Sequence, residues 1–270
     1  MSYAETDPVI QVRDLVKEFD GRRVLNRISF CVHPGERLAI LGPSGGGKST
    51  LLSCLIGATI PEEGEIRLLG EVLRPKDRKA MDRLRLKFGV MFQGGALFSS
   101  MSIHDNVALP IRRHSGLADE TIDILVGMKL NQVGLFAASE RFPDELSGGM
   151  IKRAALARAM ALDPALVFID EPSAGLDPVT VAGIDDLLLK QATTHDVTML
   201  VVTHDMQSAY RIASRLIMLY KGEILFDGSP QEIRECEDPV VRQFVEGRKD
   251  GPLGFQESTM DFRKLLLEGD

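Results

Sequence analysis

A glycine-rich loop between a strand pattern and a helix pattern is the feature that most constrains this chain. Residues 42–49 read Gly-Pro-Ser-Gly-Gly-Gly-Lys-Ser, after an apolar run at 38–41 and before a helical pattern that begins at Thr50. The spacing G-x-x-x-x-G-K-[ST] in this context is typical of a loop that cradles the phosphates of a nucleotide. Main-chain N–H groups and the positive end of the following helix would face the anion. The residues predicted to bind the nucleotide are Gly42, Pro43, Ser44, Gly45, Gly46, Gly47, Lys48, Ser49 and Thr50.

Two of these side chains have distinct predicted roles. Lys48 would reach the terminal phosphates, and the hydroxyl of Ser49 would ligate Mg²⁺. The sequence therefore predicts ATP or a similar triphosphate together with Mg²⁺. The alternative, a glycine-rich turn with a nearby lysine, does not explain the flanking strand and helix patterns.

Composition and charge exclude several classes of protein. The chain has 270 residues and a formal net charge of −7, with no dense run of Lys and Arg, so we expect no nucleic-acid partner. Its three cysteines lack metal-ligand spacing, and we expect no disulfide. The first residues do not resemble a signal peptide, and no apolar stretch approaches the length of about 18 residues that a membrane span requires. We therefore expect a cytoplasmic chain that reaches a membrane only through a partner.

Short apolar strand patterns alternate with helical ones, which indicates an α/β fold with a largely parallel sheet. Strands are predicted at 9–16, 24–33, 37–41, 88–92, 166–170, 198–203, 215–220 and 223–227, the last two around a Lys221-Gly222 turn. Residues 99–163 have helical periodicity and predict a helical subdomain inserted into the α/β core. Domain limits are predicted at 8–236, followed by a C-terminal extension at 237–270.

Four of the buried-type strands end in residues that can do chemistry. The first leads into the phosphate loop, and the others lead to Gln93, to Asp170-Glu171 and to His204. Ligands of open α/β sheets bind beyond the carboxyl ends of the strands, so these residues are expected to meet at one edge.

Asp170 closes an apolar strand pattern, and such an acid holds Mg²⁺ in phosphate-loop proteins. Glu171 follows it on what we expect to be extended backbone, where its side chain points to the opposite side and can polarise the attacking water. Gln93 can contact both metal and water, and His204 can hydrogen-bond the terminal phosphate. The alternatives are a helix-capping acid for Asp170 and Glu171 and a structural role for His204.

A second phosphate-type helix start occurs at Ser147, Gly148 and Gly149. Ser147 is a natural N-cap, and two glycines let main chain approach an anion closely. Because one nucleotide already has its phosphates in the first loop, this second site suits a nucleotide held by another copy. A plain N-cap with a flexible hinge remains the alternative. Phe19, ahead of the first loop, can stack on an adenine ring or pack as a core side chain.

Together these residues resemble the ATP-binding subunits of ABC transporters, over about 9–233. Phe19 matches the adenine-stacking aromatic, residues 42–49 match Walker A, and Gln93 matches the Q-loop glutamine. Residues 146–150 match the signature, and 166–170 match Walker B with Glu171 as the catalytic glutamate. Asp177 in 173–177 matches the D-loop, and His204 matches the switch histidine. Met150 departs from the usual glutamine, which puts one polar contact in doubt.

The resemblance implies a P-loop NTPase (RecA-like) core with an antiparallel β subdomain and an inserted helical subdomain. It also implies an ATPase that forms a head-to-tail homodimer, with each ATP between one phosphate loop and the partner's Ser147–Gly149 segment. Hydrolysis would then drive a membrane permease that docks near 94–110, at the cytoplasmic face of the inner membrane.

A narrower resemblance is to the Mla-type ATPases, which act with MCE-domain proteins in moving phospholipid or other lipids between bacterial membranes. It rests on residues 92–98, the Met-ended signature and the tail at 238–252. In that branch the tail reaches the partner ATPase and lies near a small STAS-domain subunit; here an apolar helical face is followed by Phe262, Leu265 and Leu266. Other cargoes, such as an amino acid or a metal, and a mechanical switch of the cell-division type remain open alternatives.

Overall fold

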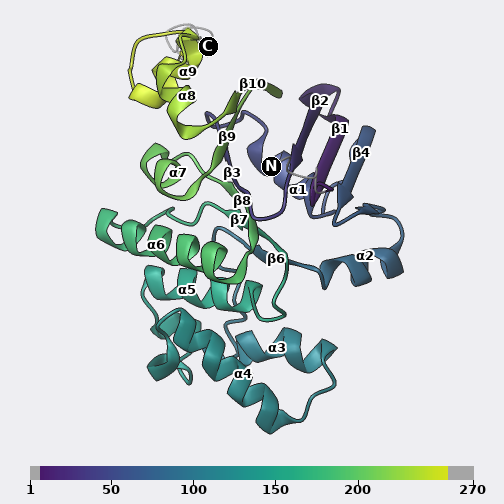
Figure 1. The fold of residues 1–270 in the computed structure, drawn as a ribbon, viewed down its shortest axis with the longest axis vertical. Helices are drawn as coiled ribbons and strands as arrows, with labels where there is room; N and C mark the ends of the chain where they lie inside the picture. The colour runs from purple at the N-terminus through teal and green to yellow at the C-terminus, as the bar shows by residue number, and fades with distance from the viewer. Residues whose placement is uncertain (1–6, 255–270) are drawn as a thin grey trace, which may run out of the picture.

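Two β-sheets with helices packed around them make up the part of the chain that the structure, a computed structural model, describes, which is residues 7–254 (Figure 1). The first sheet is antiparallel and has the strand order β2-β1-β4-β5. Its strands are β1 (Ile10–Phe19), β2 (Arg22–Val32), β4 (Glu63–Leu68) and β5 (Glu71–Val72). The antiparallel subdomain that the resemblance implied is therefore present, with β4 and β5 added to the two strands that the apolar pattern predicted.

The second sheet has the order β10-β9-β3-β8-β7-β6 and is parallel except for its edge strand β10. Its strands are β3 (Arg37–Leu41), β6 (Phe88–Met91), β7 (Leu166–Asp170), β8 (Thr198–Val202), β9 (Arg215–Tyr220) and β10 (Glu223–Gly228). The predicted strands are all found, within one to three residues at their ends. The four ends that carry chemistry belong to the adjacent strands β3, β8, β7 and β6, so they lie along one edge.

Alternating side chains of the central strands enter two different cores. On β7, Leu166 and Phe168 pack in one core with β1, β2 and the helix after the phosphate loop, whereas Val167 and Ile169 pack in another with the helices of the opposite face. A sheet covered on both faces buries every residue of its central strands, which explains why these strands read as unbroken apolar runs.

The helices divide between the faces and ends of this sheet (Figure 1). They are α1 (Lys48–Leu55), α2 (Arg78–Arg85), α3 (Ile103–His114), α4 (Asp119–Gln132), α5 (Gly148–Ala159), α6 (Pro178–His195), α7 (Met206–Ile212), α8 (Pro230–Glu235) and α9 (Pro239–Glu246), with 3₁₀ turns at Phe136–Ala138 and Pro143–Glu145. Helices α3 and α4 lie at one end of the molecule and α8 and α9 at the other. The predicted helical segment 99–163 thus holds α3, α4 and α5 without a strand.

Main-chain contacts join the two sheets beside the phosphate loop. The amide of Asn26 in β2 donates to the carbonyl of Gly222, in the turn between β9 and β10, at 2.8 Å. A Cβ on Gly222 would lie 2.5 Å from the carbonyl oxygen of Val24, so the approach requires glycine. No helix within residues 7–254 has the length and apolar character needed to cross a membrane.

The C-terminal segment is anchored by one buried glutamine. Gln243 of α9 accepts from the amide of Leu253 at 2.7 Å and donates to the carbonyls of Arg248 and Leu253, each at 3.2 Å. This fixes the chain as far as Leu253. The remainder of the predicted extension, with Phe262, Leu265 and Leu266, lies outside the described residues.

Candidate functional site

The phosphate loop is shaped by glycines at its two ends. It leaves β3 at Gly42, which has φ 140°, and it enters α1 at Gly47, which has φ 103°. A Cβ on Gly42 would lie 2.1 Å from the carbonyl oxygen of Leu219 in β9, and a Cβ on Gly47 would lie 3.0 Å from the carbonyl oxygen of Val24. Only glycine lets the loop pass this close to its neighbours at these two positions.

Lys48 is held inside its own loop. Its Nζ donates to the carbonyl oxygens of Gly42 at 2.7 Å and Pro43 at 3.0 Å, and the residue is only 9% exposed. Burial lowers the pKa of Lys48 below its ordinary value, while the carboxylates of Glu171 and Asp170 oppose that shift. An anion that reaches the loop would give this desolvated cation a better partner than two neutral carbonyls.

The other three strand ends meet the loop around a cavity of about 430 Å³. The residues that line it are Val24, Ser44, Gly45, Gly47, Lys48, Ser49, Thr50, Gln93, Glu171 and His204. The structure therefore brings together most of the predicted phosphate-loop residues with all three predicted catalytic residues. Gly42, Pro43, Gly46 and Asp170 are not among the residues that line it.

Glu171 does not have the extended backbone that the sequence analysis expected. Its φ is 46°, in the left-handed region, so the argument from alternation along a strand is wrong at this residue. The strand ends at Asp170, and the main chain turns sharply beyond it. The turn directs the Glu171 side chain into the cavity, where its Oε2 lies 2.8 Å from Nδ1 of His204.

Asp170 and Glu171 affect each other through charge. Burial raises the pKa of Asp170 above its ordinary value, the neighbouring Glu171 carboxylate raises it further, and Lys152 and Lys48 oppose both effects. Two adjacent carboxylates with buried lysines on either side form an environment in which a divalent cation would relieve the repulsion between the acids.

Residues 7–254 contain no group of three or more His, Cys, Asp and Glu side chains able to hold a metal ion by themselves. A tightly caged metal therefore does not fit this site. Mg²⁺ does fit, because it usually keeps waters and binds through one or two carboxylates plus the phosphates of its nucleotide. Ser49 and Gln93 line the same cavity, and the charge of Asp170 acts on Lys48, which also lines it.

Phe19 and the second glycine segment do not line this cavity. Phe19 ends β1 with 47% of its surface exposed, and Lys17 Nζ lies 4.7 Å from the centroid of its ring. Ser147 and Gly148 are exposed at the start of α5, where the Ser147 hydroxyl accepts from the amide of Met150 at 3.3 Å. The predicted N-cap is confirmed, and neither Ser147 nor Gly148 is among the residues that line the cavity beside the chain's own phosphate loop.

Asp177 also has a capping role in this structure. Its Oδ1 accepts from the amides of Val179 and Thr180, each at 3.0 Å, at the start of α6. The hydroxyl of Thr180 also donates to the Asp177 carboxylate. This hydrogen bond, followed by those from the amides, lowers the pKa of Asp177 below its ordinary value. The carboxylate is therefore ionised and fixed at the surface.

The sequence analysis missed two residues at the site. Val24 lines the cavity from β2, and Lys152 of α5 donates to the carbonyl oxygens of Gln93 at 2.6 Å and Glu171 at 2.7 Å. Val24 had no signal beyond its strand pattern. For Lys152, the only signal was a cation one helical turn after Ser147–Gly149.

The fold and the cavity define an ATP-binding cassette, and comparison with known families agrees. The ABC transporter family matches residues 25–174, and the chain belongs to this family. It is an ATPase subunit of a transporter, and it binds ATP. The predicted resemblance, fold class and enzyme class are thereby confirmed.

Relatives of known name match nearly the whole chain. The intermembrane phospholipid transport ATP-binding protein MlaF of Escherichia coli K12 is 40% identical over 97% of this chain and 97% of its own. The Haemophilus influenzae MlaF is 38% identical over 96% and 98%. The probable ribonucleotide transport ATP-binding protein mkl of Mycobacterium leprae is 40% identical over 96% of this chain and 76% of its own.

Solved structures show the same architecture. The ATP-binding cassette MJ0796, in a dimeric post-hydrolysis state bound to ADP and Pi, has a TM-score of 0.76 and 28% identity, covering 82% of this chain and 98% of its own. CbiO1 from Clostridium perfringens, part of the ABC transporter complex cbiONQ, has a TM-score of 0.79 and 30% identity, covering 90% and 96%.

Proposed function

We propose that this chain hydrolyses ATP to drive a membrane complex that moves phospholipid or another lipid between bacterial membranes. The observation that carries this proposal is the end-to-end match with MlaF at 38–40% identity, over 97–98% of the MlaF chains. The mkl proteins match at similar identity but over only 73–76% of their length. A ribonucleotide cargo, as the name of the mkl proteins suggests, is the second candidate.

For hydrolysis, we assign the cavity residues as follows. The phosphate loop, Gly42–Thr50, holds the phosphates, and Lys48 exchanges its two carbonyl partners for phosphate oxygens. Glu171 is the general base, and its carboxylate takes the proton of the attacking water. His204 holds that carboxylate in place and faces the terminal phosphate, while Gln93 orients the water. Lys17 covers one face of the Phe19 ring, and the opposite face stacks on the adenine.

Mg²⁺ would be held by Ser49, Gln93 and Asp170 together with the nucleotide. When bound, it would neutralise charge that develops on the transferred phosphoryl group. The raised pKa of Asp170 supports this assignment, because an acid destabilised by a like charge gains most from a cation.

The partner copy completes the site in our proposal. Ser147 and Gly148 are exposed at the N-terminus of α5 and line no part of their own chain's cavity. Two copies arranged head to tail would apply this helix end, with Asp177 nearby, to the nucleotide of the other copy. The dimeric state of MJ0796 supports the arrangement. We further propose 8–236 as the ATPase domain, 99–163 as its helical subdomain, and 237–270 as an extension that reinforces the dimer.

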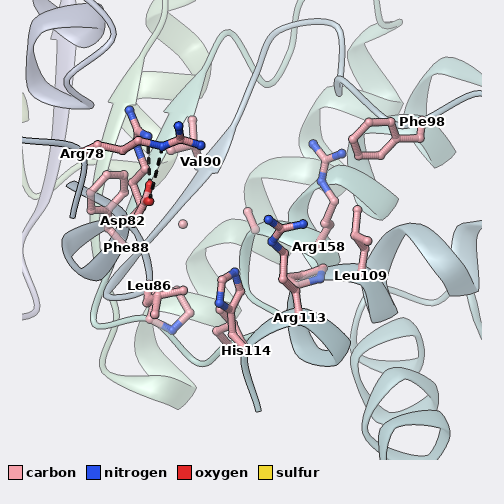
Figure 2. Close-up of a pocket in the computed structure, with 16 residues that line it drawn as sticks. Arg78, Asp82, Leu86, Phe88, Val90, Phe98, Leu109, Arg113, His114 and Arg158 are labelled. Carbon is pink, nitrogen blue, oxygen red and sulfur yellow. Dashed lines mark ion pairs between the residues drawn. The ribbon is translucent and has the colours of Figure 1, made fainter. Parts of the chain in front are cut away.

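A second pocket, of about 500 Å³, supports a permease partner at the cytoplasmic face of the inner membrane. It lies between β6 and helices α2, α3 and α5, beside the predicted docking segment. In Figure 2, Phe98 and Leu109 lie at one end, Leu86 and Phe88 at the other, and Arg113, His114 and Arg158 between them. Apolar side chains with exposed edges surrounded by cations suit an amphipathic segment that also carries carboxylates.

The charges of this groove are unbalanced. Asp82 is its one acid, and it lies 4.0 Å from Arg78 and 3.7 Å from Arg85. Arg113 and Arg158 also line the groove, but no carboxylate among the lining residues pairs with either of them. We propose that the permease segment supplies carboxylates here. An MCE-domain protein and a small STAS-domain subunit complete the proposed complex, following the Mla-type resemblance.

The test is affinity purification of the tagged chain from detergent-solubilised membranes of its own host, followed by mass spectrometry of proteins and lipids. We expect a permease, an MCE-domain protein and phospholipid. Recovery of a different permease without lipid would overturn the lipid cargo. Arg113→Glu should reduce permease recovery at least tenfold without loss of ATP affinity. Lys190→Glu, at an exposed position of α6 outside the groove, should leave permease recovery unchanged.

A further inference from the structure

Helix α5 carries a buried lysine that is bound to the two strand ends of the active site. Lys152 is 5% exposed, and its Nζ donates to the carbonyl oxygen of Gln93 at 2.6 Å and to that of Glu171 at 2.7 Å. Gln93 follows β6 and Glu171 follows β7. One ammonium group therefore joins the main chain of both strand ends to a third element.

This arrangement is energetically demanding, which argues against an incidental contact. Burial lowers the pKa of Lys152, and the charges of Glu171 and Asp170 only oppose that shift. The two hydrogen-bond partners are neutral carbonyls. Truncating the ammonium would leave both oxygens short of a donor inside the protein.

The main chain of Glu171 needs such support. A non-glycine residue in the left-handed region is strained by about 1–2 kcal/mol, and Glu171 has φ 46°. Its amide donates to the carbonyl of Val202 on β8 at 2.8 Å, and its carbonyl accepts from Lys152 on α5. The strained peptide is thus held on both sides, and in this conformation the Glu171 side chain lines the cavity.

A second cation on the same helix holds the same loop. Arg158 donates through Nη1 to the carbonyl oxygen of Ala96 at 2.7 Å and through Nη2 to that of Gly95 at 2.9 Å. Arg158 also lines the groove of Figure 2. Residues 93–96 are therefore bound to α5 at two points, and the far end of that helix is the Ser147–Gly149 segment.

We propose that Lys152 is a positioning residue for hydrolysis: it sets the main chain of Glu171 and Gln93 against α5, so that both side chains are aligned only when this helix is in place. The inference rests on the assignment of Glu171 and Gln93 made above. A nucleotide held by the partner copy can bind the start of α5, and an occupant of the groove can bind Arg158 on the same helix. Either event would shift α5 and, through Lys152, change the position of the Glu171 main chain.

The test compares steady-state hydrolysis and ATP affinity of the full-length chain for three variants. Lys152→Met keeps the aliphatic stem without the donor and should lower kcat about 10–100-fold, because an error of about 1 Å at a reacting group has an effect of this size. The KM and the dissociation constant for ATP should stay within about threefold of wild type. Lys152→Arg retains donors for both carbonyls and should recover at least a third of the wild-type kcat.

Arg153→Met is the matched control. Arg153 is the next residue of α5, and it also donates to two carbonyls, those of Val133 at 3.2 Å and Gly134 at 3.4 Å, but these lie beyond α4. Its kcat should stay within about twofold of wild type. An equal loss of kcat in Lys152→Met and Arg153→Met, or a parallel loss of ATP affinity in Lys152→Met, would overturn the inference in favour of a general packing role.

Two further measurements keep the outcome clear. If Lys152→Met does not fold, Lys152→Gln replaces it; glutamine is one atom shorter and should reach only one carbonyl, so kcat should fall about 3–10-fold, and a wild-type kcat would overturn the inference. Glu171→Gln is measured alongside. Near wild-type turnover in Glu171→Gln would overturn the assignment of the base, whereas an inactive Glu171→Gln beside a fully active Lys152→Met would overturn the role of Lys152 alone.

Discussion

The imidazole Nδ1 of His204 lies 2.8 Å from Oε2 of Glu171, so the ends of the neighbouring strands β8 and β7 are joined by side chains across the cavity. The two groups differ in their access to solvent: the His204 side chain is 66% exposed and that of Glu171 is 13% exposed. The carboxylate is thus partly buried beside an exposed imidazole, and one side of the pair stays open to a substrate.

Glu171→Gln should separate binding from turnover. The amide keeps the shape of the side chain but cannot accept the proton of water, so kcat should fall at least about 100-fold while ATP affinity is retained. Steady-state hydrolysis and a fluorescent-nucleotide titration measure the two quantities. Gel filtration with ATP should then show an accumulated dimer; hydrolysis near the wild-type rate would contradict the role of Glu171.

Lys48→Met should remove the response to nucleotide without weakening the fold. The buried ammonium is destabilised by desolvation, and methionine keeps its aliphatic stem. The Tm of the nucleotide-free protein should therefore change little, because relief of the desolvation penalty offsets the loss of the hydrogen bonds to Gly42 and Pro43. For the wild type, ATP at 100 times its dissociation constant should add about 2.7 kcal/mol to the free energy of unfolding. The variant should lack this stabilisation in a thermal melt; a full ATP-induced shift would exclude a phosphate contact for Lys48.

Two glycines of the phosphate loop should differ in their tolerance of alanine. Gly42→Ala places a Cβ 2.1 Å from the carbonyl of Leu219, whereas Gly45→Ala meets nothing within 4 Å and has only the unfavourable φ of 77°. We expect a loss of about 3 kcal/mol or more for Gly42→Ala and about 1 kcal/mol for Gly45→Ala. Urea unfolding without nucleotide gives both values; equal losses would contradict the steric argument.

Ser147→Arg should reduce hydrolysis through the dimer. Ser147 lines no part of its own chain's cavity, so the affinity of that chain for ATP should stay within about twofold of wild type. The larger side chain at the start of α5 should obstruct the approach of a second copy, and turnover should fall at least about tenfold. Thr194→Arg, at an exposed position in the last turn of α6, is the control. A drop in ATP affinity equal to the drop in turnover would contradict a role in the partner's site.

Cys54 should be the unreactive thiol of the three. It is fully buried in α1, and burial raises its pKa from 9.0 to about 11. Between pH 9 and 11 the folded state keeps the thiol proton that the unfolded state releases. The free energy of unfolding therefore falls as the pH rises through this window. A thiol reagent at pH 8 should label Cys31 and Cys236, which are partly exposed, at least about 100-fold faster than Cys54. Equal labelling rates in the native protein would contradict the burial of Cys54.

The sequence predicted the parallel strands and the residues at their ends because each buried strand is an unbroken apolar run that closes on a polar residue. Strands β4 and β5 and helix α2 lie between Glu63 and Arg85 in a stretch rich in charged residues, and their burial is partial, so no such run marks them. The pairing of β4 with β1 in the structure is what identifies the apolar residues of β4 as core positions.

The conformation of Glu171 and the reach of Lys152 could not have been predicted in the same way. A left-handed turn at a glutamate has no signature in composition or spacing. The contacts of Lys152 depend on how α5 packs across the ends of β6 and β7, which is a tertiary property. The sequence thus predicted which residues are chemically competent, and the fold determined what holds them.

The 2.1 Å approach that a Cβ on Gly42 would make to β9 has an evolutionary consequence. The contact is with main chain, so no change of side chain at position 219 can relieve it. A duplicated copy that had lost hydrolysis would therefore still be selected to keep Gly42 for folding alone, while Gly45 and Lys48 would be free to drift. Retention of Gly42 alone therefore indicates that a chain folds, and it does not indicate that the chain hydrolyses ATP.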